Sequence, residues 1–176
     1  MLTSLGANAR AVRTPKDLEG LDGLVMPGGE STTMTLGIER EGLADPLREL
    51  AASGTPMFGT CAGLIMLDRE HLGIMDIVAR RNAFGRQVHS FEEELQFPDL
   101  EGEPVRAVFI RAPWLAEYGD AVEILAEVDG HPVAAREGNV LVIAFHPELS
   151  GDDRLHRLFL TMVAVRESAQ REERAA

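Results

Sequence analysis

The segment that most restricts the fold of this chain is an apolar strand that leads directly into an apolar helix. Residues 55–60 have the length and apolar character of a buried strand, and residues 61–67 those of a helix. Their junction, Gly59-Thr60-Cys61-Ala62-Gly63, has the form Gly-x-nucleophile-x-Gly of a nucleophile elbow, with cysteine as the nucleophile. Small residues on both sides let the chain turn sharply, so we expect the Cys61 side chain to stand exposed above a sheet.

The order of elements in the first half of the chain favours a parallel sheet. Residues 21–26 form another short apolar run, which Pro27-Gly28-Gly29 ends. Helices are expected to follow, the first capped by Ser31 or Thr32 and the second beginning at Asp45-Pro46. Alternation of strand and helix implies right-handed crossovers and a parallel sheet that is covered on both faces.

The second half adds strand-like runs separated by turn signals such as Asp129-Gly130, which is the pattern of antiparallel hairpins. These runs are residues 74–79, 105–110, 122–128, 132–135 and 140–145. A last helix, capped by Ser150 or Asp152, has apolar residues at helical spacing, and its charged end, residues 166–176, is expected to fray. The predicted fold class is α/β, with an open, mostly parallel sheet flanked by helices, added antiparallel hairpins, and a single domain over residues 1–176.

Composition and charge argue against several classes of protein. The chain of 176 residues has 29 Asp and Glu against 17 Lys and Arg, and its formal net charge of −12 disfavours nonspecific binding of nucleic acid. No apolar run approaches the roughly 20 residues of a membrane helix, and no export signal opens the chain. The single cysteine excludes an internal disulfide and predicts a reducing compartment, for which the cytoplasm is the simplest choice. No metal site is expected, because the histidines other than His146 lack the spacing of metal ligands. They are interpreted as surface residues: His71, His89, His131 and His156.

Two candidates for chemistry follow predicted strands. A helix N-terminus behind Cys61 favours the thiolate, and the backbone N–H of Ala62 is free to bind an oxyanion. The alternative is a buried structural cysteine, which is the more common fate of a lone cysteine. In Phe145-His146-Pro147-Glu148, an extended chain would project Glu148 to the same side as His146. Cys61, His146 and Glu148 would then be nucleophile, base and orienting acid, although a histidine before proline is more often a surface or turn residue.

The third candidate is Met-Pro-Gly-Gly-Glu-Ser-Thr at residues 26–32. Paired glycines let backbone amides turn toward a ligand, so the N–H of Gly29 is a candidate second oxyanion donor opposite Ala62. A plain strand-to-helix turn is the alternative, and the absence of a Gly-Lys-Ser/Thr ending rejects a phosphate loop. The basic run at residues 80–87, like Arg111, is either a solvated edge or a site for a carboxylate or phosphate.

Together these motifs resemble those of class I glutamine amidotransferases, and within them those of the glutaminase subunits of pyridoxal 5′-phosphate synthase. Five segments carry the resemblance, which covers nearly the whole chain: Pro27-Gly28-Gly29-Glu30-Ser31-Thr32-Thr33, Gly59-Thr60-Cys61-Ala62-Gly63-Leu64-Ile65, Arg81-Asn82-Ala83-Phe84-Gly85-Arg86-Gln87, Phe109-Ile110-Arg111-Ala112-Pro113 and Phe145-His146-Pro147-Glu148-Leu149. The resemblance implies a flavodoxin-like three-layer fold and a reaction without a cofactor.

The resemblance also implies a role for each matching residue. Cys61 would attack the side-chain carboxamide of L-glutamine, His146 would act as base and then as acid toward the leaving ammonia, and Glu148 would orient His146. Six positions match the glutamine-binding residues of the family: Gly29, Glu30, Ser31, Arg81, Ile110 and Arg111.

Partners follow from the same resemblance. The ammonia would pass through a channel to a synthase subunit, which combines it with a pentose phosphate and a triose phosphate to make pyridoxal 5′-phosphate. Twelve glutaminases surround a dodecameric synthase core in the family, and the glutaminase is poorly active until it docks. Two alternatives stay open: an amidotransferase subunit of another synthase, such as the one that forms imidazole glycerol phosphate, and a degenerate, noncatalytic docking subunit.

The sequence departs from the family at its start. Family members begin with a short apolar strand that ends in a Leu-Gln-Gly turn and leads into a helix. Residues 1–6 resemble the last turns of that helix, and neither the strand nor its glutamine is in the sequence. Because that strand lies inside the sheet, its loss should impair the enzyme. We therefore expect a late assigned start, or omitted residues, rather than a naturally shortened enzyme.

Overall fold

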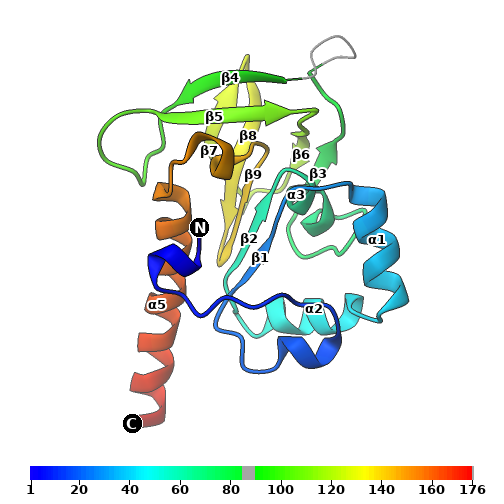
Figure 1. The fold of residues 1–176 in the computed structure, drawn as a ribbon, viewed down its shortest axis with the longest axis vertical. Helices are drawn as coiled ribbons and strands as arrows, with labels where there is room; N and C mark the ends of the chain where they lie inside the picture. Colours follow the sequence, from blue (N-terminus) through cyan, green and yellow to red (C-terminus); the bar gives the residue numbers. More distant parts are fainter. Residues whose placement is uncertain (85–89, 176) are drawn as a thin grey trace.

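The centre of the fold is a five-stranded sheet, drawn in Figure 1. The computed structural model describes residues 1–84 and 90–175. In spatial order the strands are β1 (Leu24–Met26), β2 (Met57–Thr60), β9 (Val140–Ile143), β8 (His131–Glu137) and β7 (Glu123–Val128). β2 pairs in parallel with β1 and β9, whereas β8 pairs antiparallel with β9 and β7. The sheet is therefore a parallel unit extended by an antiparallel hairpin.

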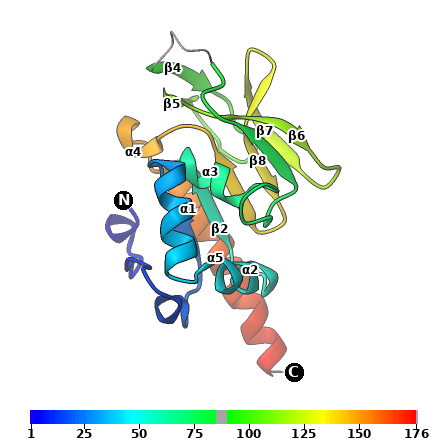
Figure 2. The same cartoon turned by 90° about the vertical axis from the view of Figure 1, so that its right-hand side faces the viewer.

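Helices lie on both sides of this sheet, as Figures 1 and 2 show. On one side are α1 (Ser31–Arg40), α2 (Ala44–Ala52) and α3 (Ala62–Leu67), and on the other is α5 (Arg154–Ala175). Successive side chains of β2 point to opposite faces. Phe58 is fully buried with its ring centroid 5.9 Å from that of Phe159 in α5, whereas Gly59 lies beside Leu67 of α3. Burial on both faces explains why this strand is a continuous apolar run.

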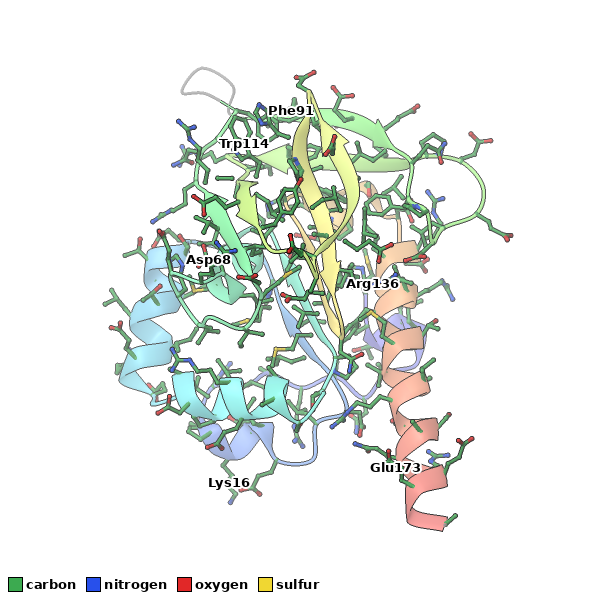
Figure 3. The ribbon with its side chains drawn as sticks, turned by 180° about the vertical axis from the view of Figure 1, so that it is seen from behind. Lys16, Asp68, Phe91, Trp114, Arg136 and Glu173 are labelled. Atoms are coloured by element: carbon green, nitrogen blue, oxygen red, sulfur yellow. The ribbon has the colours of Figure 1, made fainter. Side chains whose placement is uncertain are left out.

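Two further two-stranded sheets extend the fold. β3 (Ile77–Arg80) pairs antiparallel with β6 (Trp114–Tyr118), and β4 (Ser90–Leu95) pairs antiparallel with β5 (Val105–Ile110). Aromatic rings join them, because Phe84 contacts both Phe91 and Trp114, which Figure 3 labels. Phe91 also stacks on Phe109 with the ring centroids 4.6 Å apart.

The α/β class and the helix-flanked sheet with added hairpins are confirmed, and several details differ from expectation. The sequence did not predict β4, β6 or the short helix α4 (Pro147–Ser150). Glu30, rather than Ser31 or Thr32, caps α1. The charged end of α5 remains helical to Ala175 instead of fraying. None of the described helices is both long enough and apolar enough to cross a membrane.

Residues 1–23 contain two short 3₁₀ helices, Thr3–Leu5 and Pro15–Leu18, and no strand. β1 is consequently an edge strand, hydrogen-bonded within the sheet to β2. Gly6 ends the first 3₁₀ helix with a φ of 89°, the left-handed conformation that glycine commonly adopts at helix ends. A groove of about 880 Å³ is lined by side chains of this N-terminal segment, of β1 and of α5.

Candidate active site

Cys61 lies at the turn between β2 and α3 in an uncommon backbone conformation. Its φ is 49° and its ψ is −104°. A non-glycine residue held in such a sparsely populated region costs about 1–3 kcal/mol and persists only where the surrounding structure determines it. The N–H of Cys61 donates to Ile143 O of β9 at 2.8 Å. The sharp strand-to-helix turn expected at Cys61 is therefore present and is fixed to the neighbouring strand.

The glycines on both sides of Cys61 allow other parts of the chain to pass unusually close. A Cβ on Gly63 would lie 1.9 Å from Met26 O of β1. A Cβ on Gly59 would lie 2.8 Å from Leu67 Cδ1 and 2.9 Å from the carbonyl carbon of Gly63. Glycine is the residue that tolerates such approaches. α3 can therefore pack directly on β1 and β2 and hold the turn in place.

His146 follows β9 and has its ring beside both Cys61 and Glu148. Its backbone N–H donates to Val108 O of β5 at 2.9 Å, and its Nδ1 lies 2.8 Å from Glu148 Oε1. Because an ionised carboxylate accepts hydrogen bonds, Nδ1 carries the proton and Nε2 is the nitrogen left for Cys61. The neighbouring Cys61 side chain, and then the hydrogen bond with Glu148, raise the pKa of His146 from 6.5 to about 9 against the opposing effect of burial.

Glu148 reaches the imidazole by a different route from the extended chain that the sequence predicted. His146 is the N-cap of α4, and the N–H of Leu149 donates to His146 O at 3.1 Å. Pro147 occupies the first helical position, where its fixed φ favours the start of a helix. A helical turn therefore brings the carboxylate to Nδ1, and the Glu148 side chain stays 45% exposed.

The raised pKa of His146 predicts a loss of stability in alkaline solution. A histidine whose pKa rises from 6.5 to about 9 on folding stabilises the folded state fully below the lower value. This contribution disappears as the pH rises through the higher value. We expect the melting temperature to fall between about pH 7 and about pH 9.5 by more in the wild type than in His146→Gln, measured by calorimetry. Equal falls in both proteins would contradict the prediction.

The two candidate oxyanion donors follow the carboxyl ends of adjacent parallel strands, where α/β sheets place their sites. Ala62 is the first residue of α3, so its N–H has no acceptor within the helix. Gly29 follows β1, which pairs in parallel with β2. The N–H of Gly28 donates to Thr60 Oγ1 at 3.0 Å. That bond fixes the loop after β1 to the residue that precedes Cys61.

Glu30 and Arg81, two of the residues predicted to bind glutamine, form an ion pair with 3.6 Å between Arg81 Nη2 and Glu30 Oε1. The Glu30 carboxylate also accepts from the N–H groups of Thr32 at 3.0 Å and Thr33 at 2.7 Å. These bonds, together with the stronger effect of the Thr33 hydroxyl, lower the pKa of Glu30 to about 2. Ser31 begins α1 and is buried. Glu30 is thus ionised at neutral pH and attracts the Arg81 guanidinium to the loop after β1.

The carboxyl end of β5 lies against Cys61. Ile110 O lies 3.9 Å from Cys61 Sγ, and Cys61 is 7% exposed. The prediction that the thiol stands exposed above the sheet is therefore wrong. Arg111 follows with a φ of 45° and is exposed. The N–H of Ala83 donates to Ala112 O at 3.1 Å, which joins this segment to the turn after β3.

Among the described residues, the other histidines, His71, His131 and His156, make their contacts elsewhere in the fold. The interpretation of His156 as a surface residue is wrong, because it is 7% exposed and lies edge-on to Phe58. It shares the buried side of α5 with Phe159, three residues further on, and burial lowers its pKa. His89 and residues 85–87 of the basic run lie outside the described residues. Within residues 1–84 and 90–175, no three His, Cys, Asp or Glu side chains are grouped as ligands of a metal ion.

Comparison with known proteins agrees with this geometry. The model of the SNO glutamine amidotransferase family matches residues 1–165. The chain belongs to this family. A relative from Corynebacterium jeikeium (strain K411), named pyridoxal 5′-phosphate synthase subunit PdxT, is 58% identical over 172 residues, which are 92% of this chain and 88% of the relative. A relative of the same name from Geobacillus kaustophilus (strain HTA426) is 53% identical over 169 residues, 92% of this chain and 86% of the relative.

A solved structure supports the same assignment for this SNO glutamine amidotransferase. A crystal structure described as that of a glutamine amidotransferase matches with a TM-score of 0.86 and 44% identity, covering 93% of this chain and 90% of the other. The resemblance that the five sequence segments carry is therefore confirmed at the level of the family. The α/β fold class is confirmed with it.

Proposed function

We propose that this SNO glutamine amidotransferase is a glutaminase that hydrolyses L-glutamine to L-glutamate and ammonia through Cys61, His146 and Glu148. One observation carries the proposal: beside a strained cysteine, with a φ of 49°, lies a histidine whose Nδ1 is 2.8 Å from a carboxylate oxygen. A nucleophile, a base and an orienting acid in mutual contact form the triad used for acyl transfer.

In the proposed reaction, the sulfur of Cys61 bonds to the carboxamide carbon of glutamine, and the carbonyl oxygen becomes an oxyanion. The N–H groups of Gly29 and Ala62 stabilise that oxyanion. His146, which holds the proton of the thiol, gives it to the leaving nitrogen, and ammonia departs. A water molecule that His146 deprotonates then attacks the thioester, which releases glutamate and restores the thiol. Glu148 keeps the imidazole in one orientation throughout.

The substrate is proposed to lie between the loops after β1, β3 and β5. The guanidinium groups of Arg81 and Arg111 suit its α-carboxylate, and the ionised Glu30 suits its α-ammonium group. Ile110 O, 3.9 Å from Cys61 Sγ, is near enough to accept a hydrogen bond from the reacting carboxamide. Ser31 completes the set, at the buried start of α1.

The ammonia is proposed to pass through a channel to a synthase subunit that makes pyridoxal 5′-phosphate. The names of the two relatives, at 58% and 53% identity, support this partner. We infer an assembly of twelve glutaminases around a dodecameric synthase core, with residues 1–176 as one domain of each glutaminase. The free thiol of Cys61 favours the reducing cytoplasm as its location.

Two other functions have less support. An amidotransferase subunit of a different synthase would not be expected to share 58% identity with a subunit named for pyridoxal 5′-phosphate synthase. A noncatalytic docking subunit would have no need for the strained backbone at Cys61 or for the bond from His146 to Glu148.

Isotope transfer tests the proposed function. The chain is mixed with the synthase subunit of the same organism, a pentose phosphate, a triose phosphate and glutamine labelled with ¹⁵N in its side-chain amide. Because channelled ammonia does not mix with the solution, we expect labelled pyridoxal 5′-phosphate by mass spectrometry even with excess unlabelled ammonium. Absence of glutamate would contradict the glutaminase activity. Glutamate without labelled product would contradict the proposed partner.

A further inference from the structure

Gly28, the first glycine of the loop after β1, lies directly against the imidazole of His146. A Cβ on Gly28 would stand 2.4 Å from Cε1 of the ring, 3.0 Å from Nδ1 and 3.4 Å from Nε2. Atoms in van der Waals contact are about 3.5–4.0 Å apart, so a side chain at this position would displace the ring by about 1 Å. The His146 ring can occupy this position only because residue 28 lacks a side chain.

Neither backbone conformation nor main-chain packing explains this glycine. Among the described residues, the glycines with a positive φ include Gly29 but not Gly28, so alanine fits the backbone at position 28. Gly63 provides the contrast, because a Cβ there would meet Met26 O, a main-chain atom, at 1.9 Å. The three atoms nearest to a Cβ on Gly28 all belong to the His146 ring.

A hydrogen bond ties Gly28 to the strand that carries the nucleophile. The N–H of Gly28 donates to Thr60 Oγ1 at 3.0 Å, and Thr60 is 3% exposed. Thr60 immediately precedes Cys61, and β1 and β2 pair in parallel up to this point. Gly28 therefore contacts the His146 ring and is fixed, through one residue, to Cys61.

We propose that Gly28 is a positioning residue, whose bare α-carbon supports the His146 ring and whose bond to Thr60 sets the distance from that ring to the Cys61 sulfur. The proposal rests on the proposed function, because it assigns a role in the same reaction. Glu148 holds the ring at Nδ1, but a single hydrogen bond lets a ring tilt. The contact with Gly28 removes that freedom.

The test compares Gly28→Ala with Gly37→Ala. Gly37 lies in α1, where a Cβ meets nothing within 4 Å, so this control adds the same methyl group away from the ring. Misplacement of a reacting group by about 1 Å costs about 100-fold in rate. In the complex with the synthase subunit, we expect Gly28→Ala to lower kcat by about 100-fold and to change KM by less than about twofold. Gly37→Ala should keep the wild-type kcat.

Nuclear magnetic resonance reports the ring position independently of turnover. The pKa of His146, about 9, depends first on the neighbouring Cys61 side chain. We expect the titration midpoint of the His146 ring proton, assigned with His146→Gln, to fall toward 6.5 in Gly28→Ala and to stay unchanged in Gly37→Ala. A glycine that merely eased folding would leave this midpoint where it is.

Thr60→Val keeps the proposal testable if Gly28→Ala does not fold. It leaves residue 28 bare but removes the acceptor of its N–H, so kcat should fall about tenfold and the His146 midpoint should also decrease. Provided that Cys61→Ala is inactive, either of two results would overturn the proposal. One is a wild-type kcat in a folded Gly28→Ala. The other is a titration midpoint of His146 that is unchanged in both Gly28→Ala and Thr60→Val. Equal rates in wild type and Cys61→Ala would instead overturn the proposed function.

Discussion

Replacement of Cys61 by alanine is expected to lower glutamate release in the complex with the synthase subunit by at least about 10⁴-fold. Alanine cannot form the thioester, so only substrate binding and the oxyanion donors remain to accelerate direct attack by water. The methyl side chain fits where the thiol was, so the turn between β2 and α3 should persist. The melting temperature should fall because the stabilising interaction of Cys61 with His146 is lost, and an unchanged circular dichroism spectrum would separate lost chemistry from lost structure.

The chain offers a chemical control for this variant. It contains one cysteine, so iodoacetamide can modify no other thiol. Alkylation should inactivate the wild type in proportion to the label bound, and bound glutamine should slow the labelling. If the wild type releases glutamate no faster than Cys61→Ala, the glutaminase assignment is wrong.

The sequence predicted the parallel unit of the sheet because these strands are buried on both faces. β2 and β9 are buried at every position, so apolar residues dominate their sequences and no charged residue interrupts them. Glycines also marked the turn at Cys61, since close passage of Met26 and Leu67 excludes side chains at Gly63 and Gly59. These features are local consequences of the fold, and sequence patterns record them.

β4 escaped prediction because its stability comes from pairing with β5 rather than from its own residues. Glu92, Glu93 and Glu94 are poor strand formers, and none is buried. The strand exists through its pairing with β5, where Arg106 Nη2 lies 2.6 Å from a Glu92 carboxylate oxygen. Phe91 adds a stacked contact with a ring of β5. The residues of β4 by themselves do not indicate this pairing.

The candidate site, too, could be predicted from the sequence only in part. The types of residue and their strand-end positions could be recognised from the sequence, whereas contacts between distant segments could not. The cover over Cys61 comes from Ile110, and the support of the His146 ring comes from Gly28. The capping role of Glu30 depends on where α1 begins, which propensity fixes only to within a residue or two.

Glu148→Gln is expected to lower kcat by about 10³-fold while KM changes by less than about twofold. The neutral amide no longer stabilises the imidazolium, and its NH₂ group can turn toward Nδ1 and favour the wrong tautomer. The effect should be smaller than that of Cys61→Ala, because the Glu148 side chain is 45% exposed and water can replace part of its hydrogen bonding. Steady-state glutamate release in the complex measures both parameters.

The division of the effect between kcat and KM decides what Glu148 does. Its carboxylate oxygen lies 2.8 Å from His146 Nδ1, and its contribution to the raised pKa of His146 should be lost in the variant. The pKa of the imidazole should therefore move down from about 9. The alkaline limb of the kcat/KM profile, where His146 loses the proton that it gives to the leaving nitrogen, should move with it. Glu173→Gln supplies the control, because it makes the same change from carboxylate to amide at the exposed far end of α5. A large rise in KM with normal kcat would mean that Glu148 binds glutamine instead of orienting His146.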